Sequence, residues 1–403
     1  MDLKSGYPFW AIKNGLMCVF PQLKADISCD VVVVGGGITG ALIADELGSN
    51  GFDVVVVEQR DIGWGSSAAS TALLQYEIDT HLVDLAKTYG EFEAVQAYQA
   101  CAKAITDLRD LANELGDVDF DMQESLYYAS KRSHKAVLRE EYDLRLKHGF
   151  DVQWLDSDSL KQGFGIKAPC AILTKLAARV DPYRMASKLL LRLAERGGRI
   201  FDRTIIDSIE PADEGVTLRT PEGLCIQAKH VVMAAGYASQ AWLKQSVAQN
   251  RSSYAFITDP IDPADLGLLA STMIWESARP YLYMRSTGDG RLLVGGDDDD
   301  MDIPSRRDKR VESKARGLAK KVKKLLPSLP LPPGFSWGGT FAETADGLPF
   351  FGEHAQYGPR VQFAMAYGGN GISYSMLGAG LLRANIEGRP HPLAKLFGFS
   401  RLD

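Results

Sequence analysis

Two valine runs on either side of a glycine-rich turn constrain the fold more than any other feature of this chain. Residues 31–34 and 54–57 are all valine, and runs that are apolar on both faces are typical of interior strands in a parallel sheet. Glycines follow the first run, and three of them have expected roles: Gly35 permits a tight turn, Gly37 lets the main chain approach a pyrophosphate, and Gly40 lets the following helix pack closely on the strand. The segment therefore predicts a βαβ unit that binds a dinucleotide.

The residues next to these glycines refine the prediction. Ile38 and Thr39 begin the expected helix, whose N-terminal amides and dipole favour an anion such as a pyrophosphate. Glu58 closes the second strand, where an acidic side chain accepts hydrogen bonds from ribose hydroxyls and repels a 2′-phosphate. The alternative is a Rossmann-like fold without a nucleotide, in which the glycine turn is a coincidence.

Length and charge restrict the class of protein. A chain of 403 residues exceeds one ordinary core, so we expect two structural units. The formal net charge of −6 argues against nucleic acid as the main partner. No apolar run approaches the length of a membrane span, and residues 1–28 lack a secretory pattern, so the cytoplasm is the expected location.

The cysteines and histidines predict neither disulfides nor a metal site. No C-x-x-C pair occurs, and the six histidines show no metal-ligand spacing. The five cysteines, which we expect to be structural, are Cys18, Cys29, Cys101, Cys170 and Cys225.

A pair of apolar segments in the second half predicts an antiparallel hairpin. Residues 281–285 and 291–295 flank a glycine turn. Alternation would place Tyr281, Tyr283 and Arg285 on one face, which lines either a wet surface or a ligand cavity.

Two charged segments follow this hairpin. The aspartate run 297–300 is interpreted as a solvated loop, because calcium loops need alternating ligands and a glycine bend. Residues 306–324 carry ten Lys or Arg and an apolar stripe, so we expect a solvated helix lying on the fold. Peripheral contact with an anionic membrane or an acidic electron carrier is the less favoured interpretation of this helix.

Further motifs occur in a fixed order along the chain. They comprise a loop of small residues at 59–71, Val-Asp-Pro at 180–182, Ala-Ala-Gly at 234–236, the segments 337–340 and 344–349, and the glycine-rich segment 366–372. Together with the opening glycines, they resemble the D-amino-acid oxidase superfamily of FAD-dependent oxidoreductases, which includes glycine and sarcosine oxidases.

The resemblance implies an α/β fold of the glutathione-reductase type. A Rossmann-like FAD-binding domain would be accompanied by a discontinuous α+β substrate domain built on an antiparallel sheet. The expected division is a leader at 1–28 that packs on the body, an FAD-binding domain at 29–85, 170–250 and 335–403, and a substrate or cap domain at 86–169 and 251–334.

The late glycine-rich segment favours FAD over NAD, because a nicotinamide enzyme needs only one binding unit. A helix beginning at Gly371 would direct its positive dipole end at the flavin pyrimidine ring, where negative charge develops on reduction. The expected cofactor-binding residues are Gly35, Gly37, Ile38, Thr39, Gly40, Glu58, Gln59, Arg60, Ser66, Ser67, Ser70, Thr71, Ile205, Ala235, Gly236, Gly347, Gly369, Asn370, Gly371 and Ile372.

Three positions depart from the family pattern. Gly339 matches the cysteine that attaches flavin covalently in some relatives, so noncovalent FAD is expected. Phe341 matches the arginine that binds a carboxylate in glycine oxidase, and Arg285 is the proposed replacement. Leu293 matches the lysine that promotes the reaction with oxygen, so a quinone or another carrier is considered beside O2 as electron acceptor.

The resemblance implies oxidation of the C–N bond of a small amine or amino acid, with hydride transfer to flavin N5 giving an imine. The candidate catalytic and substrate-binding side chains are Tyr254, Tyr281, Tyr283, Arg285 and Tyr374, with His354 as an outside choice. Two alternatives remain open: an FAD-dependent dehydrogenase of a 2-hydroxy acid or polyol phosphate, and a non-catalytic flavoprotein.

Overall fold

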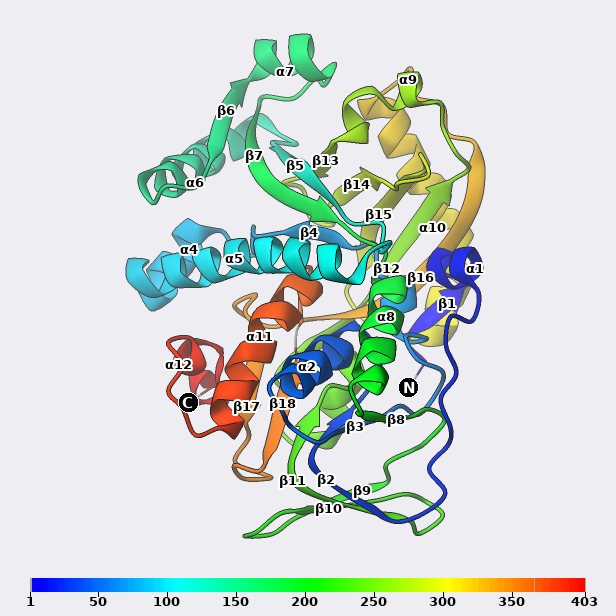
Figure 1. The fold of residues 1–403 in the computed structure, drawn as a ribbon. Coiled ribbons are helices and arrows are strands. Elements are labelled where there is room, and N and C mark those ends of the chain that lie inside the picture. Colours follow the sequence, from blue (N-terminus) through cyan, green and yellow to red (C-terminus); the bar gives the residue numbers. More distant parts are fainter. Residues whose placement is uncertain (1, 366, 403) are drawn as a thin grey trace.

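The computed structural model describes residues 2–365 and 367–402, and these form two sheets with helices packed around them (Figure 1). Ala366, which belongs to the glycine-rich segment identified from the sequence, lies outside the described residues. The smaller sheet carries the predicted βαβ unit, and the larger sheet lies beside it.

The smaller sheet has the strand order β17-β18-β11-β2-β3-β8, with β9 and β10 continuing from β11. Its central strands are parallel: β2 pairs with β3 and β11, and β11 pairs with β18. The bounds are β2 Ile27–Val34, β3 Val54–Val57, β8 Arg199–Phe201, β9 Ser208–Pro211, β10 Val216–Arg219, β11 Cys225–Met233, β17 Phe350–Glu353 and β18 Val361–Met365. Both predicted valine strands are therefore confirmed as neighbours in a parallel sheet.

Three helices pack together beside this sheet: α2 (Ile38–Ser49), α8 (Pro182–Glu195) and α11 (Gly371–Ile386). Helix α8 begins within the Val-Asp-Pro motif, because the Asp181 carboxylate accepts a hydrogen bond from the Arg184 amide and Pro182 occupies the first turn. The helix predicted after the glycine-rich segment is α11, and it contacts α2 (Figure 1).

The larger sheet has the order β1-β16-β12-β15-β14-β13-β5-β7-β4, and β6 pairs with β7. Most of its pairs are antiparallel, although β13 and β5 run parallel. The bounds are β1 Lys4–Gly6, β4 Leu73–Gln75, β5 Asp121–Tyr128, β6 Val152–Asp156, β7 Cys170–Arg179, β12 Gln249–Thr258, β13 Thr272–Glu276, β14 Leu282–Ser286, β15 Leu292–Asp299 and β16 Pro333–Glu343. The predicted hairpin is confirmed as β14 and β15.

Most of the other helices contact strands of the larger sheet, whereas α12 (Ala394–Phe397) contacts β17 of the smaller sheet (Figure 1). Helix α10 (Pro304–Leu325) packs on β12, β15 and β16 through the buried side chains Val311, Leu318 and Val322. The remaining helices are α1 Phe9–Asn14, α3 Ser66–Ala69, α4 Leu82–Tyr89, α5 Glu91–Leu115, α6 Lys135–Lys147, α7 Ser157–Phe164, α9 Pro263–Leu266 and α12 Ala394–Phe397. The short 3-10 turns are η1 Arg132–His134, η2 Gly236–Trp242, η3 Gly267–Ala270 and η4 Phe399–Leu402.

Strand pairing divides the chain differently from the expected domain boundaries. Strands β4, β7 and β16 fall mostly in segments assigned to the FAD-binding domain, yet they pair within the larger sheet. The chain crosses between the two sheets at these strands. Segments assigned to the FAD-binding domain therefore also contribute strands to the larger sheet.

The N-terminal segment packs on the body of the protein. Strand β1 pairs with β16, and Trp10 in α1 is fully buried. The Trp10 indole donates a hydrogen bond of 2.7 Å to the carbonyl of Ser70. Among the described residues, no helix is both long and apolar enough to cross a membrane.

The interpretation of residues 297–300 as a solvated loop is wrong. Residues 297–299 end strand β15, and the side chains of Asp297 and Asp299 form ion pairs with Lys314 of α10 at 3.5 and 3.1 Å. Helix α10 lies on the fold as expected, and these carboxylates neutralise part of its positive charge because the apolar stripe orients the helix against β15.

Candidate functional site

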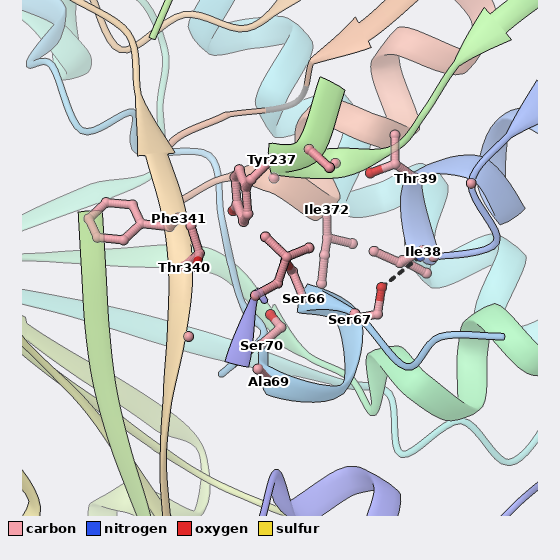
Figure 2. A pocket seen from close by; sticks show the side chains of 18 of the residues that line it. Ile38, Thr39, Ser66, Ser67, Ala69, Ser70, Tyr237, Thr340, Phe341 and Ile372 are labelled. Carbon is pink, nitrogen blue, oxygen red and sulfur yellow. Dashed lines mark hydrogen bonds between the residues drawn. The ribbon is translucent and has the colours of Figure 1, made fainter. Parts of the chain in front are cut away.

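A cavity extends from the glycine turn of the smaller sheet to the inner strands of the larger sheet (Figure 2). One end is formed by the ends of β2 and β3, the start of α2, and residues 65–73. The segment after β11 and the start of α11 form further walls. The cavity therefore joins segments that lie far apart in the sequence.

The glycine turn has the geometry that the sequence predicts. Gly35 has a φ of +121°, and a Cβ at this position would lie 2.3 Å from the carbonyl oxygen of Ala234. A Cβ on Gly40 would lie 1.8 Å from the carbonyl oxygen of Gly35. These two glycines are required by the fold, whereas Gly37 lines the cavity at the start of α2.

A loop of small side chains faces this turn. Ile38 donates its amide to the Ser67 hydroxyl at 2.8 Å, as Figure 2 shows. The Ser66 hydroxyl is buried without a hydrogen-bond partner and lines the cavity. Since a buried polar atom normally has a partner, Ser66 indicates that a polar ligand completes this wall.

Glu58 occupies the position expected for a ribose ligand. Its carboxylate lines the cavity and accepts hydrogen bonds from the Gly36 amide at 2.8 Å and the Arg60 amide at 2.9 Å. Burial raises the pKa of the Glu58 carboxyl, although these amides oppose the increase. The main chain thus holds the carboxylate in place at the end of β3.

Most of the expected cofactor-binding residues meet at this cavity. The residues that line it are Gly35, Gly37, Ile38, Thr39, Glu58, Gln59, Arg60, Ser66, Ser67, Ser70, Thr71, Ile205, Ala235, Gly236, Gly369, Asn370, Gly371 and Ile372. Gly40 acts through helix packing instead. Gly347 does not line the cavity: it turns the chain with a φ of +75° beside Thr80 and accepts a hydrogen bond from Tyr374.

The start of α11 is fixed against the larger sheet. The Asn370 side-chain amide donates to the carbonyls of Gln75 and Glu77, each at 2.9 Å. The Gly369 amide donates to Asp79 at 2.9 Å. The positive end of the α11 dipole is therefore held at the cavity, where it favours negative charge.

Two tryptophans that the sequence analysis missed hold the small-residue loop. The Trp10 indole donates to the carbonyl of Ser70, and the Trp337 indole donates to the carbonyl of Ala69 at 2.8 Å. Both indoles are almost completely buried. No local signal marks this role, because each tryptophan meets the loop from a distant strand or helix.

This donor set fits FAD. Gly37 leaves room at a helix N-terminus for a pyrophosphate, and Glu58 can accept hydrogen bonds from ribose hydroxyls. The buried Ser66 hydroxyl, which has no hydrogen-bond partner, lines the same cavity. The cavity then continues past the start of α11, which gives the space that a second, aromatic ring system requires.

Aromatic side chains form the wall at the larger sheet. Tyr281 and Tyr283 both line the cavity, with ring centroids 5.6 Å apart. Tyr237 and Trp275, which the sequence analysis did not select, join them, and Figure 2 shows Tyr237 facing the residues of the small-residue loop. Burial raises the pKa of Tyr283 to about 12, so this phenol is neutral at physiological pH.

Arg285 does not line the cavity, so the prediction that it binds a substrate carboxylate is wrong. Its guanidinium is completely buried and donates to the main-chain carbonyls of Thr71, Ser286 and Val180 at 2.7 to 3.0 Å. It also lies over the Trp10 ring, 5.4 Å from the ring centroid. Arg285 shares a strand face with the two tyrosines, but its guanidinium holds the small-residue loop through the carbonyl of Thr71.

Three other candidates have structural roles. The Tyr254 hydroxyl donates to Asp299 at 2.8 Å beside α10, and the Tyr374 hydroxyl donates to the carbonyl of Gly347 at 2.8 Å. His354 packs its ring edge-on against Phe399 and does not line the cavity. Tyr254 borders the cavity, but its hydroxyl is bonded to Asp299 and is not available to a ligand in the cavity.

The acidic side chain that the sequence analysis missed is Asp298. It lines the cavity, and its Oδ1 atom is buried without a hydrogen-bond partner. Burial raises the pKa of Asp298 to about 7; the charges of Glu343 and Asp79 add to this increase, while Ser253 and Arg279 oppose it. The only sequence signal was the aspartate run, which gives no indication of which carboxylate faces inward.

The three departures from the family pattern have different surroundings. Gly339 and Phe341 line the cavity from β16, and Figure 2 shows Phe341 beside Thr340. Leu293 is fully buried in a cluster with Trp10 and Trp337 and does not line the cavity. Among the described residues that line the cavity there is no cysteine, histidine or lysine. The described part of the chain contains no cluster of His, Cys, Asp or Glu suited to a metal ion.

Comparison with known proteins agrees with this geometry. The family model described as "FAD dependent oxidoreductase" matches residues 30–384. The γ-glutamylputrescine oxidoreductase of Escherichia coli is 25% identical over 94% of this chain and 88% of its own length. The glycine oxidase of Geobacillus kaustophilus is 26% identical over 92% of this chain and 96% of its own length.

The fold agrees as well. A crystal structure of glycine oxidase from Geobacillus kaustophilus superposes with a TM-score of 0.79 and 22% sequence identity, covering 93% of this chain and 99% of that one. The match of the family model over most of the chain and the cavity that fits a dinucleotide lead to the same conclusion: this chain belongs to the D-amino-acid oxidase (DAO) family of FAD-dependent oxidoreductases.

Proposed function

We propose that this protein oxidises the C–N bond of a small amine with the help of noncovalently bound FAD. The observation that carries the proposal is the continuous cavity, in which the expected FAD-binding residues meet a wall that includes Tyr281, Tyr283 and Trp275. Similar proteins include a glycine oxidase and a γ-glutamylputrescine oxidoreductase, whose names refer to amine and amino-acid compounds. The absence of cysteine and histidine from the described cavity lining supports noncovalent attachment.

Bound FAD supplies the hydride acceptor for such a reaction. The protein's own residues hold the substrate C–H bond at reacting distance and exclude water, which favours the neutral amine over ammonium. Trp275 contributes to this enclosure because its indole donates to Ser125 at 3.0 Å and its ring stacks on Tyr127 with centroids 3.8 Å apart. The amine loses a hydride and a proton, and water then hydrolyses the imine to a carbonyl compound and ammonia.

The charges of the cavity disfavour the alternative substrates. A 2-hydroxy acid or polyol phosphate carries an anion that needs a cationic partner. Among the described cavity-lining residues the only cation is Arg60, which follows Glu58 at the dinucleotide end. A carboxylate or phosphate placed near Tyr281 and Tyr283 would therefore meet the lining carboxylates, whereas Arg279, 4.5 Å from the Tyr281 ring centroid, does not line the cavity and forms ion pairs with Asp79 and Glu343.

For the electron acceptor we propose a quinone or protein carrier in preference to O2. Leu293, at the position of the lysine that promotes the oxygen reaction in related oxidases, is buried away from the cavity. With no lysine among the described cavity-lining residues, no lysine ammonium would stabilise superoxide as it forms. We place the enzyme in the cytoplasm, where the five free cysteines would stay reduced.

The proposal is tested by an anaerobic screen of the FAD-loaded protein. Small amines, amino acids and hydroxy acids are added in turn, and the flavin absorbance is recorded. We expect amines to bleach the flavin and hydroxy acids to leave it oxidised. Bleaching by hydroxy acids alone would support the dehydrogenase alternative, and bleaching by dithionite alone would support a non-catalytic flavoprotein.

A further inference from the structure

The substrate end of the cavity is lined by carboxylates that the proposed reaction does not use. Glu77, Asp79 and Asp298 line it together with the aromatic side chains described above. The charge of Asp79 raises the pKa of both Tyr237 and Tyr281, after the larger effect of burial. The acidic and aromatic groups therefore share one compartment.

Asp298 reaches this compartment through a β-bulge. Ser252 pairs with Asp299 and Tyr254 pairs with Gly296, so Ser253 alone is opposite both Asp297 and Asp298. The extra residue changes the direction of the strand locally, and Asp297 takes a φ of +57°. The bulge thus separates Asp298 from its neighbours, which face α10, and leaves its Oδ1 buried and unpaired in the cavity wall.

Glu77 provides an independent indication of a missing cation. Its side chain is 3% exposed, and neither carboxylate oxygen has a hydrogen-bond partner. The nearest cation is Arg145, 3.6 Å away, but Arg145 also pairs with the buried Glu141 at 2.7 Å. Burial raises the pKa of Glu77 and Arg145 opposes the increase, so one guanidinium shared between two buried carboxylates leaves the ionised Glu77 without a full counterion.

The surrounding groups favour an ammonium ion as the missing partner. The faces of Tyr281, Tyr283 and Trp275 suit a cation electrostatically. Arg279 lies 4.5 Å from the Tyr281 ring centroid, but it does not line the cavity, and its ion-pair distances to Asp79 and Glu343 are 3.9 and 3.7 Å. It therefore screens the acidic wall only in part.

We propose that the enzyme selects amines that carry a second, cationic amino group, as in linear diamines. The inference rests on the proposed function: one nitrogen reacts as the free base, while the distal ammonium binds Asp298 within the acidic and aromatic compartment. Glu77 and Asp79 add to the negative potential around that ammonium. A carboxylate in place of the distal ammonium is repelled by the same groups.

The test uses matched compounds on the FAD-loaded enzyme without oxygen. Linear α,ω-diamines of three to six carbons are compared with the alkylamine, amino alcohol and ω-amino acid of equal length. We expect the best diamine to reduce the flavin with an apparent second-order rate constant at least roughly tenfold above those of its analogues, because pairing in a dry site favours the second charge. An alkylamine or amino acid that matches or exceeds the diamine would overturn the inference and leave amine oxidation standing. Reduction by no amine at all would instead reject the proposed function.

Two variants test whether Asp298 causes the preference for diamines. Asp298→Asn should lower the rate constant for the diamine by a much larger factor than that for the alkylamine, and so remove most of the diamine preference, because the distal charge loses its partner. Asp300→Asn is the matched control, since this carboxylate in the same aspartate run is 96% exposed and pairs with Arg251. A thermal-shift titration gives a readout besides turnover: the diamine should raise the Tm of wild type and Asp300→Asn but not of Asp298→Asn. An equal preference or equal Tm shift in all three proteins would contradict the role of Asp298.

Discussion

The Tyr254 hydroxyl donates a 2.8 Å hydrogen bond to Asp299 on the α10 side of the larger sheet, whereas the adjacent Asp298 lines the cavity on the other side. Strand alternation and the bulge at Ser253 together produce this separation. Adjacent carboxylates in one aspartate run therefore serve different purposes: Asp299 anchors α10, and Asp298 remains available to a ligand.

Asp298 should make folding stability depend on pH. Its folded-state pKa of about 7 lies above the usual value because of burial, so the folded protein holds this proton more tightly than the unfolded chain. Stability should fall as the pH rises from about 4 to about 7, with a loss on the order of 1 to 4 kcal/mol, and then level off.

Denaturant unfolding of wild type and Asp298→Asn across this pH range measures the effect. The variant should lack this part of the pH dependence, so that the stability difference between the two proteins changes in its favour as the pH rises from 4 to 7. Parallel curves for the two proteins would show that Asp298 titrates normally.

Replacing Arg285 by Leu should destabilise the protein and loosen FAD, because three main-chain carbonyls lose their donor in a buried site. We expect a loss of about 3 kcal/mol or more in the free energy of unfolding. Reductive half-reaction kinetics on the fraction that retains FAD should show an unchanged apparent Kd for amine. A large increase in that Kd with unchanged stability would place Arg285 in the substrate site after all.

Gly37→Val should prevent FAD binding without unfolding the smaller sheet. The new Cβ would lie 3.0 Å from the Ser67 hydroxyl, and its methyl groups would occupy the cavity at the start of α2. Flavin per protein chain should fall by at least about tenfold, measured by absorbance after gel filtration, because the main chain can no longer approach the pyrophosphate. Gly163→Ala is the control, since a Cβ there meets nothing within 4 Å.

Tyr254 on β12 and Tyr283 on β14 should behave differently when each is changed to Phe. Tyr254→Phe removes the hydrogen bond to Asp299 and should cost about 1 kcal/mol of stability with little change in flavin reduction by amine. Tyr283→Phe changes a hydroxyl that lies 3.4 Å from the Ser253 hydroxyl in the cavity wall, and it should alter the rate of that reduction. Stopped-flow reduction and thermal unfolding of both variants test the distinction, which equal effects on the rate would contradict.

The dinucleotide half of the site could be predicted because its chemistry is local in sequence. Gly35, Gly37 and Glu58 belong to one βαβ unit, and the packing constraints on these positions leave few alternatives. The hairpin of β14 and β15 was also predictable, since alternation and a glycine turn identify it.

The substrate half could not be predicted in the same way. Arg285 was assigned to the cavity because it alternates with Tyr281 and Tyr283, but alternation fixes the strand face and not what lies above each position along the strand. Trp10 and the carbonyl of Thr71 cover Arg285. Asp298 was missed for a related reason: the bulge that points it into the cavity depends on pairing with β12, which is distant in sequence.

Anaerobic single-turnover reduction of the FAD-loaded protein by an amine, with hydrogen and then deuterium at the carbon next to nitrogen, decides whether this protein oxidises a C–N bond. We expect that the amine bleaches the visible flavin absorbance, that deuterium slows the bleaching, and that the products are a carbonyl compound and ammonia. A protein that binds FAD and is bleached by dithionite, but keeps its absorbance with every amine and diamine supplied, would contradict it.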